Sequence, residues 1–242
     1  MLGMNSSSAS AGRSDFQTLL GGQADKLMLW TQAGQSRPVS LNVAAILIGA
    51  GLYGAAMGWW RSPLQGLYVA IKFPLVIVLT ALGNALLNAM LAPLLGLNIG
   101  FRQSFLAILM SLAITAAILG AFSPLMAFVV WNAPPMTPDV KSTPTYGFIK
   151  LTHVAMIAFA GIAGTVRLFQ LLAQLGGSKP VARRVLFAWL AGNLFLGSQL
   201  TWLARPFIGS PQLPVVFLRD TALRGNFYEN FFRTIGQLLQ FD

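Results

Sequence analysis

Side chains that could perform chemistry are rare in this chain of 242 residues, which has one histidine, six acidic residues and no cysteine. Without cysteine there is no thiolate nucleophile, disulfide framework or iron–sulfur cluster. The single histidine, His153, cannot form a His-rich metal site. A carboxylate pair for acid–base catalysis would have to be assembled by folding, because the acidic residues are dispersed along the sequence. We therefore expect no catalytic residue, no metal site and no cofactor, and a protein that is not an enzyme.

Three ionisable residues lie in apolar stretches, where such groups are functional candidates by default. Lys150 and His153 are three residues apart and share one face of a predicted helix. They could line a polar path for a solute or a proton, or bind a ligand; the alternative is a pair of interfacial residues with no such role. Lys72 lies near the end of another apolar stretch, where its long side chain can extend to the membrane surface, so it is weak evidence of a site.

Two asparagines, Asn84 and Asn88, are four residues apart, so both amides lie on one face of a predicted helix. An unpaired amide is costly in hydrocarbon, and each side chain must therefore find a partner. We favour hydrogen bonds between helices, with Ser111, Thr115 or Asn193 as the partners. The alternative is a polar lining for a substrate path.

Small residues recur every four positions in the first apolar stretch, at Ala50, Gly54 and Gly58. A ridge of this kind lets a second helix approach closely. We expect the ridge to pack within the bundle rather than between two copies of the chain.

The composition predicts the elements that position these residues, because 55% of the chain is hydrophobic and only 9% is charged. Soluble chains have roughly 25% charged residues, so the sequence predicts an integral membrane protein. Its apolar windows are long enough for membrane-spanning helices, which need about 20 residues, and too unbroken for barrel strands. The predicted fold is an all-α, polytopic transmembrane helical bundle. The five predicted spans are 41–60, 67–95, 105–131, 147–173 and 185–204.

The distribution of Lys and Arg predicts the orientation, because cytoplasmic loops carry an excess of both. Residues 1–40 are expected to form a polar, partly disordered cytoplasmic segment, and the C-terminus is expected to lie outside. The first span is predicted to be an uncleaved anchor. The basic excess is expected to contact anionic lipid headgroups rather than nucleic acid. The residues expected to do so are Arg167, Lys179, Arg183 and Arg184.

The C-terminal segment 205–242 begins with closely spaced prolines, which exclude a continuous helix and predict a stiff link. Asn226 and Glu229 match a capping box, which predicts that a helix starts there. Apolar residues fall on one stripe of this helix, so it is predicted to be amphipathic and interfacial. We expect the stripe to dock on protein, either the chain's own bundle or a neighbouring subunit. The residues expected to make this contact are Phe227, Phe231, Phe232 and Ile235.

The tail reads RPFIGSP…PVVFLR…GNFYE, and this block resembles that of a group of uncharacterised bacterial polytopic inner-membrane proteins. The layout of a polar N-terminus, five spans and an outward C-terminus is similar to the Yip1 family of membrane-trafficking proteins. These resemblances imply an interaction or scaffold protein in a bacterial inner membrane. The predicted function is a non-enzymatic assembly or accessory subunit of a membrane complex, with membrane lipids and other membrane proteins, or further copies of itself, as partners. The alternative is a small transporter or channel subunit.

Overall fold

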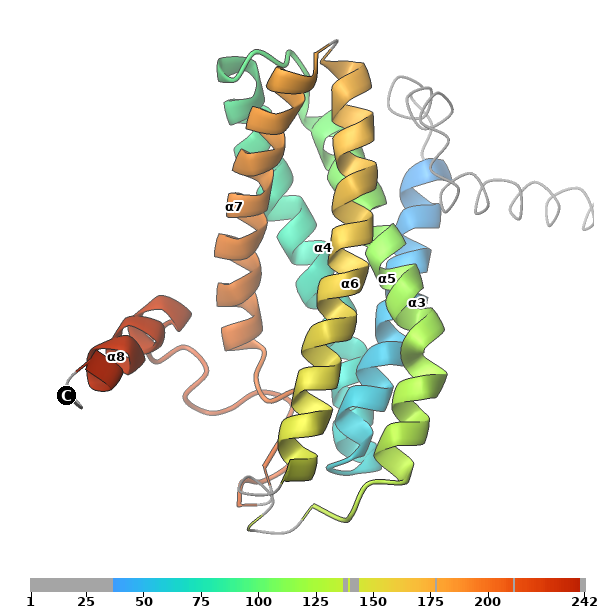
Figure 1. Ribbon diagram of the computed structural model, residues 1–242, viewed down its shortest axis with the longest axis vertical. Helices are drawn as coiled ribbons and strands as arrows, with labels where there is room; N and C mark the ends of the chain where they lie inside the picture. Colours follow the sequence, from blue (N-terminus) through green and yellow to red (C-terminus); the bar gives the residue numbers. More distant parts are fainter. Residues whose placement is uncertain (1–36, 137–138, 140–143, 177, 211, 240–242) are drawn as a thin grey trace, which may run out of the picture.

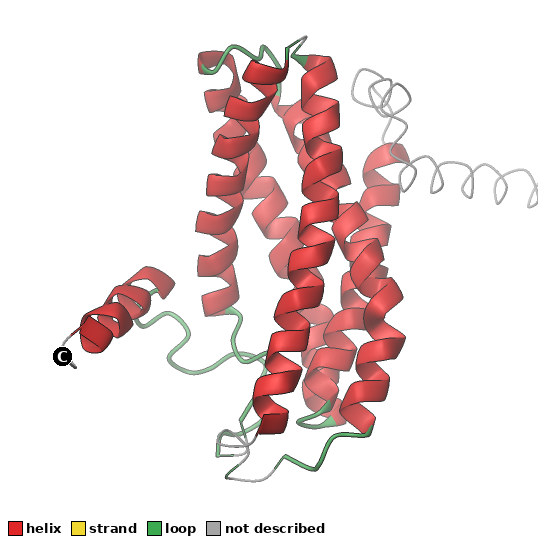
Figure 2. Ribbon diagram, in the orientation of Figure 1, coloured by secondary structure: helices red, strands yellow, loops and turns green. Residues whose placement is uncertain are grey.

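The computed structural model describes residues 37–136, 139, 144–176, 178–210 and 212–239, which form six helices and no strand (Figure 1, Figure 2). The prediction of an all-helical fold is confirmed for this part of the chain. Most of the predicted polar N-terminal segment lies outside the described residues. Its last four residues belong to the first described helix, which begins at Arg37.

Five long helices run alongside one another in one bundle, and consecutive helices are antiparallel (Figure 1). Short turns join α3 to α4 and α6 to α7, so these pairs are hairpins. The five helices are α3 (Arg37–Trp59), α4 (Pro63–Leu94), α5 (Phe101–Trp131), α6 (Pro144–Leu175) and α7 (Lys179–Leu203).

Four of these helices, α3 to α6, are long and apolar enough to cross a membrane. They indicate an integral membrane protein. The fifth predicted span, 185–204, falls in α7, which does not meet the same criterion of length and composition. Its first two turns carry Lys179, Arg183 and Arg184, and its second half contains several amide and hydroxyl side chains, so its average hydropathy is lower.

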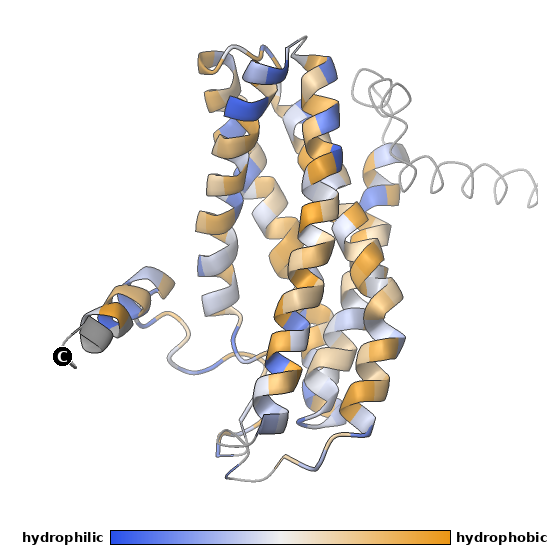
Figure 3. Cartoon of the chain, viewed as in Figure 1, coloured by the Kyte–Doolittle hydropathy of each residue, from blue (hydrophilic) through white to orange (hydrophobic). Residues whose placement is uncertain are grey.

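Apolar residues predominate along the long helices (Figure 3). Some of their side chains are buried between the helices, and others are exposed on the outside of the bundle. Leu106, Leu109 and Trp189 are completely enclosed in the core. On the outer surface, Met90 and Phe187 are about three-quarters exposed, at 75% and 76%. A continuous apolar surface of this extent requires an apolar environment, which the lipid bilayer provides.

The predicted small-residue ridge faces α4, within the molecule, and Ala50 is fully buried. A Cβ atom added at Gly54 would lie 2.7 Å from the carbonyl oxygen of Val69, and one at Gly58 would lie 2.6 Å from that of Gln65. Glycine is therefore required at both positions, because any side chain would overlap the backbone of α4.

A second close approach, between α3 and α5, has no counterpart in the sequence predictions. Gly49 packs against the backbone of α5 at Ala116, and a Cβ atom at Gly120 would lie 2.7 Å from Gly49 Cα. Helix α3 is thus in backbone contact with α5 on one side and with α4 on the other.

Residues 204–226, which we call the link, leave α7 and cross the end of the bundle at which α3 joins α4 (Figure 1). The chain then enters α8 (Phe227–Leu239), which lies at one side of the bundle, across the direction of the long helices (Figure 1). This arrangement places the link against α4 and the α3–α4 turn.

Candidate functional site

The link is held by a buried lysine of α4. Lys72 is only 2% exposed, and its Nζ donates hydrogen bonds to the carbonyl oxygens of Pro206 at 2.6 Å and Phe217 at 2.9 Å. The same atom lies 5.5 Å from the ring centres of Phe207 and Phe217. Within the described residues no carboxylate pairs with it. Two carbonyl dipoles and two aromatic faces therefore offset the cost of burying the ammonium group. The Lys72 side chain therefore ends on the link and is shielded from solvent.

A second side chain of α4 strengthens this contact. Gln65 is 1% exposed and donates from Nε2 to the carbonyl oxygens of Pro206 at 2.9 Å and Phe207 at 2.8 Å. Gln65 and Lys72 are seven residues apart, which is about two helical turns, so both lie on one face of α4. The sequence shows these two polar residues in an apolar stretch, but only the fold shows that both bind the link.

A cavity of about 300 Å³ separates part of the link from α4 and the α3–α4 turn. Arg61 lines it from the turn, Gln65 lines it from α4, and Arg219 lines it from the link. The Arg61 side chain donates from Nη2 to the carbonyl oxygen of Leu213 at 3.3 Å. It also packs against Gly209, whose φ of +88° favours glycine. We call this space the link cavity.

Positive charge is concentrated around the link cavity. Arg219 lies close enough to Lys72 and Arg205 for charge repulsion with both. Partial burial and the Arg219 charge together lower the pKa of Arg205 below its ordinary value. The Arg205 guanidinium also lies over the ring of Trp202, 3.1 Å from its centre. Among the residues that line the cavity, Asp220 is the acidic one, and it is exposed.

The sequence pairs Lys150 with His153, but the structure separates their side chains. His153 is 3% exposed and faces the core, where its Nδ1 is 2.9 Å from the Tyr53 hydroxyl. Lys150 is exposed on the outside of α6. The Tyr53 ring packs on Phe73, which in turn packs on Phe207 of the link. His153 therefore belongs to a buried cluster that connects α6, α3 and α4 to the link.

The two asparagines of α4 are buried, and Asn84 joins α4 to α7. Asn84 donates from Nδ2 to the Trp189 carbonyl oxygen at 3.0 Å and to Asn193 Oδ1 at 2.6 Å. Asn88 donates to the carbonyl oxygen of Asn84 at 2.7 Å and to its Oδ1 at 2.5 Å. Asn193 is thus a hydrogen-bond partner of Asn84, as the sequence predicted. Ser111 and Thr115 instead donate to carbonyl oxygens of α6.

Among the described side chains, those of the first turn fix helix α8 to α7. The Phe227 backbone N–H donates to Gln199 Oε1 at 3.0 Å, and the Tyr228 hydroxyl donates to the Phe195 carbonyl oxygen at 2.7 Å. The Tyr228 ring also stacks on Phe195 with a centroid distance of 5.3 Å. Other proposed docking side chains of this helix remain uncovered: Phe231 is 48% exposed, Phe232 67% and Ile235 36%.

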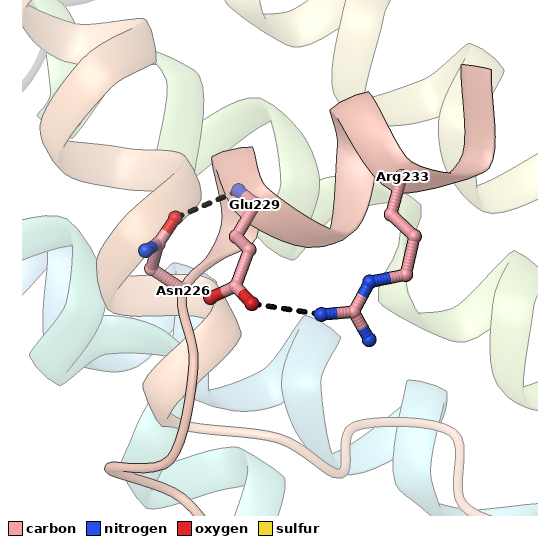
Figure 4. A network of polar contacts seen from close by, with 3 residues as sticks. All are labelled: Asn226, Glu229 and Arg233. Atoms are coloured by element: carbon pink, nitrogen blue, oxygen red, sulfur yellow. Dashed lines mark hydrogen bonds and ion pairs between the residues drawn. The ribbon is translucent and has the colours of Figure 1, made fainter. Parts of the chain in front are cut away.

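The start of α8 is capped on one side of the predicted capping box. Asn226 Oδ1 accepts a hydrogen bond from the Glu229 backbone N–H at 2.8 Å (Figure 4). The Glu229 carboxylate does not return to the cap; it forms an ion pair with Arg233 at 2.8 Å, one turn further along the helix (Figure 4). This i,i+4 pair and the cap together stabilise an exposed helix that has little tertiary contact.

The four basic residues predicted to bind lipid headgroups lie toward the other end of the bundle. Lys179, Arg183 and Arg184 are exposed at the start of α7. Arg167 lies about two turns before the end of α6 and donates to Gln170 Oε1 at 3.1 Å. This patch is therefore separate from the link cavity.

Comparison of the chain with protein-family models, with curated proteins and with solved structures finds no match. The resemblances drawn from the tail block and from the five-span layout stay predictions. The site is accordingly interpreted from its geometry: a segment after the bundle is bound in place by buried polar groups, and it carries a helix with an uncovered aromatic face.

Proposed function

We propose that the protein is a non-enzymatic subunit of a membrane complex, and that α8 is the element that binds a second membrane protein. The proposal rests on the way α8 is attached to the bundle and on the exposure of its aromatic side chains. Its first turn is bonded to α7, while Phe231 and Phe232 are 48% and 67% exposed beside the bundle. Burial of a large apolar side chain is worth roughly 1.5–3 kcal/mol, so a partner surface would be strongly favoured there.

The attachment of the link supports the same proposal. Lys72 and Gln65 both donate to the carbonyl oxygen of Pro206, and this contact precedes α8 by about 20 residues of chain. A passive anchor needs no such fixed placement, whereas a docking element gains affinity when it is held in its binding position before the partner arrives.

We further propose that α7 is a fifth span, with the N-terminus in the cytoplasm and the C-terminus outside, in a bacterial inner membrane. Helix α7 packs against α4 and α6 in the same bundle and has 25 residues. At about 1.5 Å per residue its length is about 37 Å, which exceeds the roughly 30 Å of bilayer hydrocarbon. Its charges are gathered at the end that this orientation places inside, in accordance with the positive-inside rule.

The fifth span can be tested with single cysteines, because the natural chain has none. If α7 crosses the membrane, a cysteine at Leu223 should react with an impermeant thiol reagent in intact cells. One at Lys179 should react only after permeabilisation. Both positions are exposed, so access within the protein is not limiting. Labelling of both cysteines from the same side would contradict the five-span proposal.

The docking role can be tested by placing a photocrosslinking amino acid at Phe232 in native membranes. We expect one discrete protein adduct, and we expect none from the matched position Phe187, which is 76% exposed on α7. Replacing Phe231 and Phe232 together with serine should reduce the mass of the complex in mild detergent. An adduct with lipid alone at Phe232, and an unchanged complex, would contradict docking and assign α8 to the bilayer surface. An adduct of twice the chain mass would identify a second copy as the partner.

The alternative of a transporter or channel subunit has less support. The predicted path needs Lys150 and His153 to act together, and Lys150 is exposed on the outer surface of α6. Asn84 makes hydrogen bonds that join α4 to α7, and Asn88 donates to Asn84 within α4; both are packing roles.

A further inference from the structure

The wall of the link cavity carries hydrogen-bonding groups that the protein itself does not satisfy. Arg61 Nε and Gln65 Oε1 are both buried and have no hydrogen-bond partner. Gln65 as a whole is 1% exposed, and its Nε2 is already committed to two carbonyl oxygens of the link. Both residues line the link cavity, and leaving such groups unpaired is costly.

In the described part of the chain, the positive charge at the cavity exceeds the negative charge, because Arg61 and Arg219 line the wall with a single carboxylate, that of Asp220. Within the described residues the Arg219 guanidinium makes no hydrogen bond or ion pair, and it repels Lys72 and Arg205. Arg61 adds a fourth cation at the cavity wall, beside the N-terminus of α4. A helix N-terminus carries partial positive charge, so the field at this point favours an anion.

Apolar groups complete the wall. Pro214, Val215 and Val216 of the link line the cavity together with Arg219. An anion with an apolar portion therefore fits this space better than a fully hydrated ion.

The cavity lies at the depth of the membrane surface. Trp59 ends α3 and is 43% exposed, and Trp131 ends α5 and is 69% exposed, both at the end of the bundle that holds Arg61. Exposed tryptophans at helix ends mark the headgroup region of a bilayer. A ligand from the adjacent leaflet would reach the cavity without crossing the hydrocarbon.

We propose that the link cavity binds the phosphate group of a membrane phospholipid, with Arg61 and Arg219 as its hydrogen-bond donors. Guanidinium groups bind phosphate oxygens through strong, charge-assisted hydrogen bonds. Gln65 Oε1 then accepts a hydrogen bond from the headgroup, which requires an ammonium or hydroxyl donor on the lipid. Phosphatidylethanolamine and phosphatidylglycerol carry such donors, and phosphatidylcholine does not.

The proposal is tested by native mass spectrometry of the full chain in detergent, titrated with each of these three lipids and, separately, with inorganic phosphate. We expect one tightly held molecule of phosphatidylethanolamine or phosphatidylglycerol per chain, and weaker retention of phosphatidylcholine. Arg61→Gln and Arg219→Gln should each weaken this binding about tenfold, because each removes a charge-assisted contact. The matched control is Arg224→Gln, which removes an exposed charge from the same segment outside the cavity and should leave binding unchanged.

Each other outcome is informative. Equal losses in Arg224→Gln and Arg219→Gln would overturn the site, because they would reflect general attraction to net charge. Unchanged binding in both cavity variants would also overturn it. Displacement of the lipid by inorganic phosphate at a similar concentration would support the anion site and overturn its assignment to lipid. If Arg61→Gln fails to fold, Arg219→Gln still tests the site. The Arg219 side chain has no hydrogen-bond or ion-pair partner within the described residues, so its replacement should not impair folding.

Discussion

Replacing Gly58 with leucine should destabilise the protein more than any other single change considered, because the side chain would overlap the backbone of α4. A Cβ atom at this position lies 2.6 Å from Gln65 O and 2.9 Å from Gly66 Cα. Backbone atoms cannot move aside as a flexible side chain can, so α3 and α4 would have to separate. Overpacking of this kind typically costs about 1–3 kcal/mol and occasionally more. The loss is measured as the fall in unfolding temperature in detergent, or in the denaturant concentration at half-unfolding.

The matched control for Gly58→Leu is Gly161→Leu, in the middle of α6. Nothing lies within 4 Å of a Cβ atom at Gly161, so leucine has space there and improves the helix propensity. We expect Gly161→Leu to keep or slightly raise the unfolding temperature. Equal stability of the Gly58→Leu and Gly161→Leu proteins would show that α3 and α4 do not touch through their backbones.

The same contact shows how much of the packing can be read from the sequence. Ala50, Gly54 and Gly58 are spaced at four residues, and this periodicity is enough to predict one close helix neighbour. Gly49 and Gly120 are single glycines in separate helices, and no spacing within either helix indicates that they meet. Only the three-dimensional arrangement places them against each other. Local periodicity therefore predicts that a helix has a packing face, and it does not predict which helix is the partner.

The candidate site shows the same limit more strongly. The composition predicts a membrane helical protein, and the prolines predict that helix α7 cannot continue into the link. The contacts of Lys72 could not be predicted, because they join residues 134 and 145 positions apart in the sequence. A lysine near the end of an apolar stretch usually extends to water. Here the link lies between Lys72 and water and supplies carbonyl oxygens, so the ammonium group binds the link instead of extending to water.

Lys72→Met should release the link while leaving the bundle folded. The substitution removes both hydrogen bonds from Nζ, so the Phe217 carbonyl oxygen loses its partner, although Pro206 keeps its bond from Gln65. Loss of a hydrogen bond to a charged group costs about 1.5–3 kcal/mol, which opens the link roughly tenfold or more often. The change is measured as faster cleavage by trypsin after Arg219 and Arg224 under native conditions.

Lys72→Met should not destabilise the helical bundle, although it releases the link. Lys72 is a buried cation without a carboxylate partner within the described residues, and burying a charge costs free energy that methionine avoids. The unfolding temperature of the helices should therefore stay the same or rise while the link becomes more accessible. Lys150→Met removes a lysine that is exposed on α6 and should alter neither cleavage nor unfolding temperature. If Lys72→Met lowers the unfolding temperature and leaves cleavage of the link unchanged, Lys72 stabilises the bundle and does not hold the link. Release of the link with an intact bundle would instead show that Lys72 fixes the segment that positions α8.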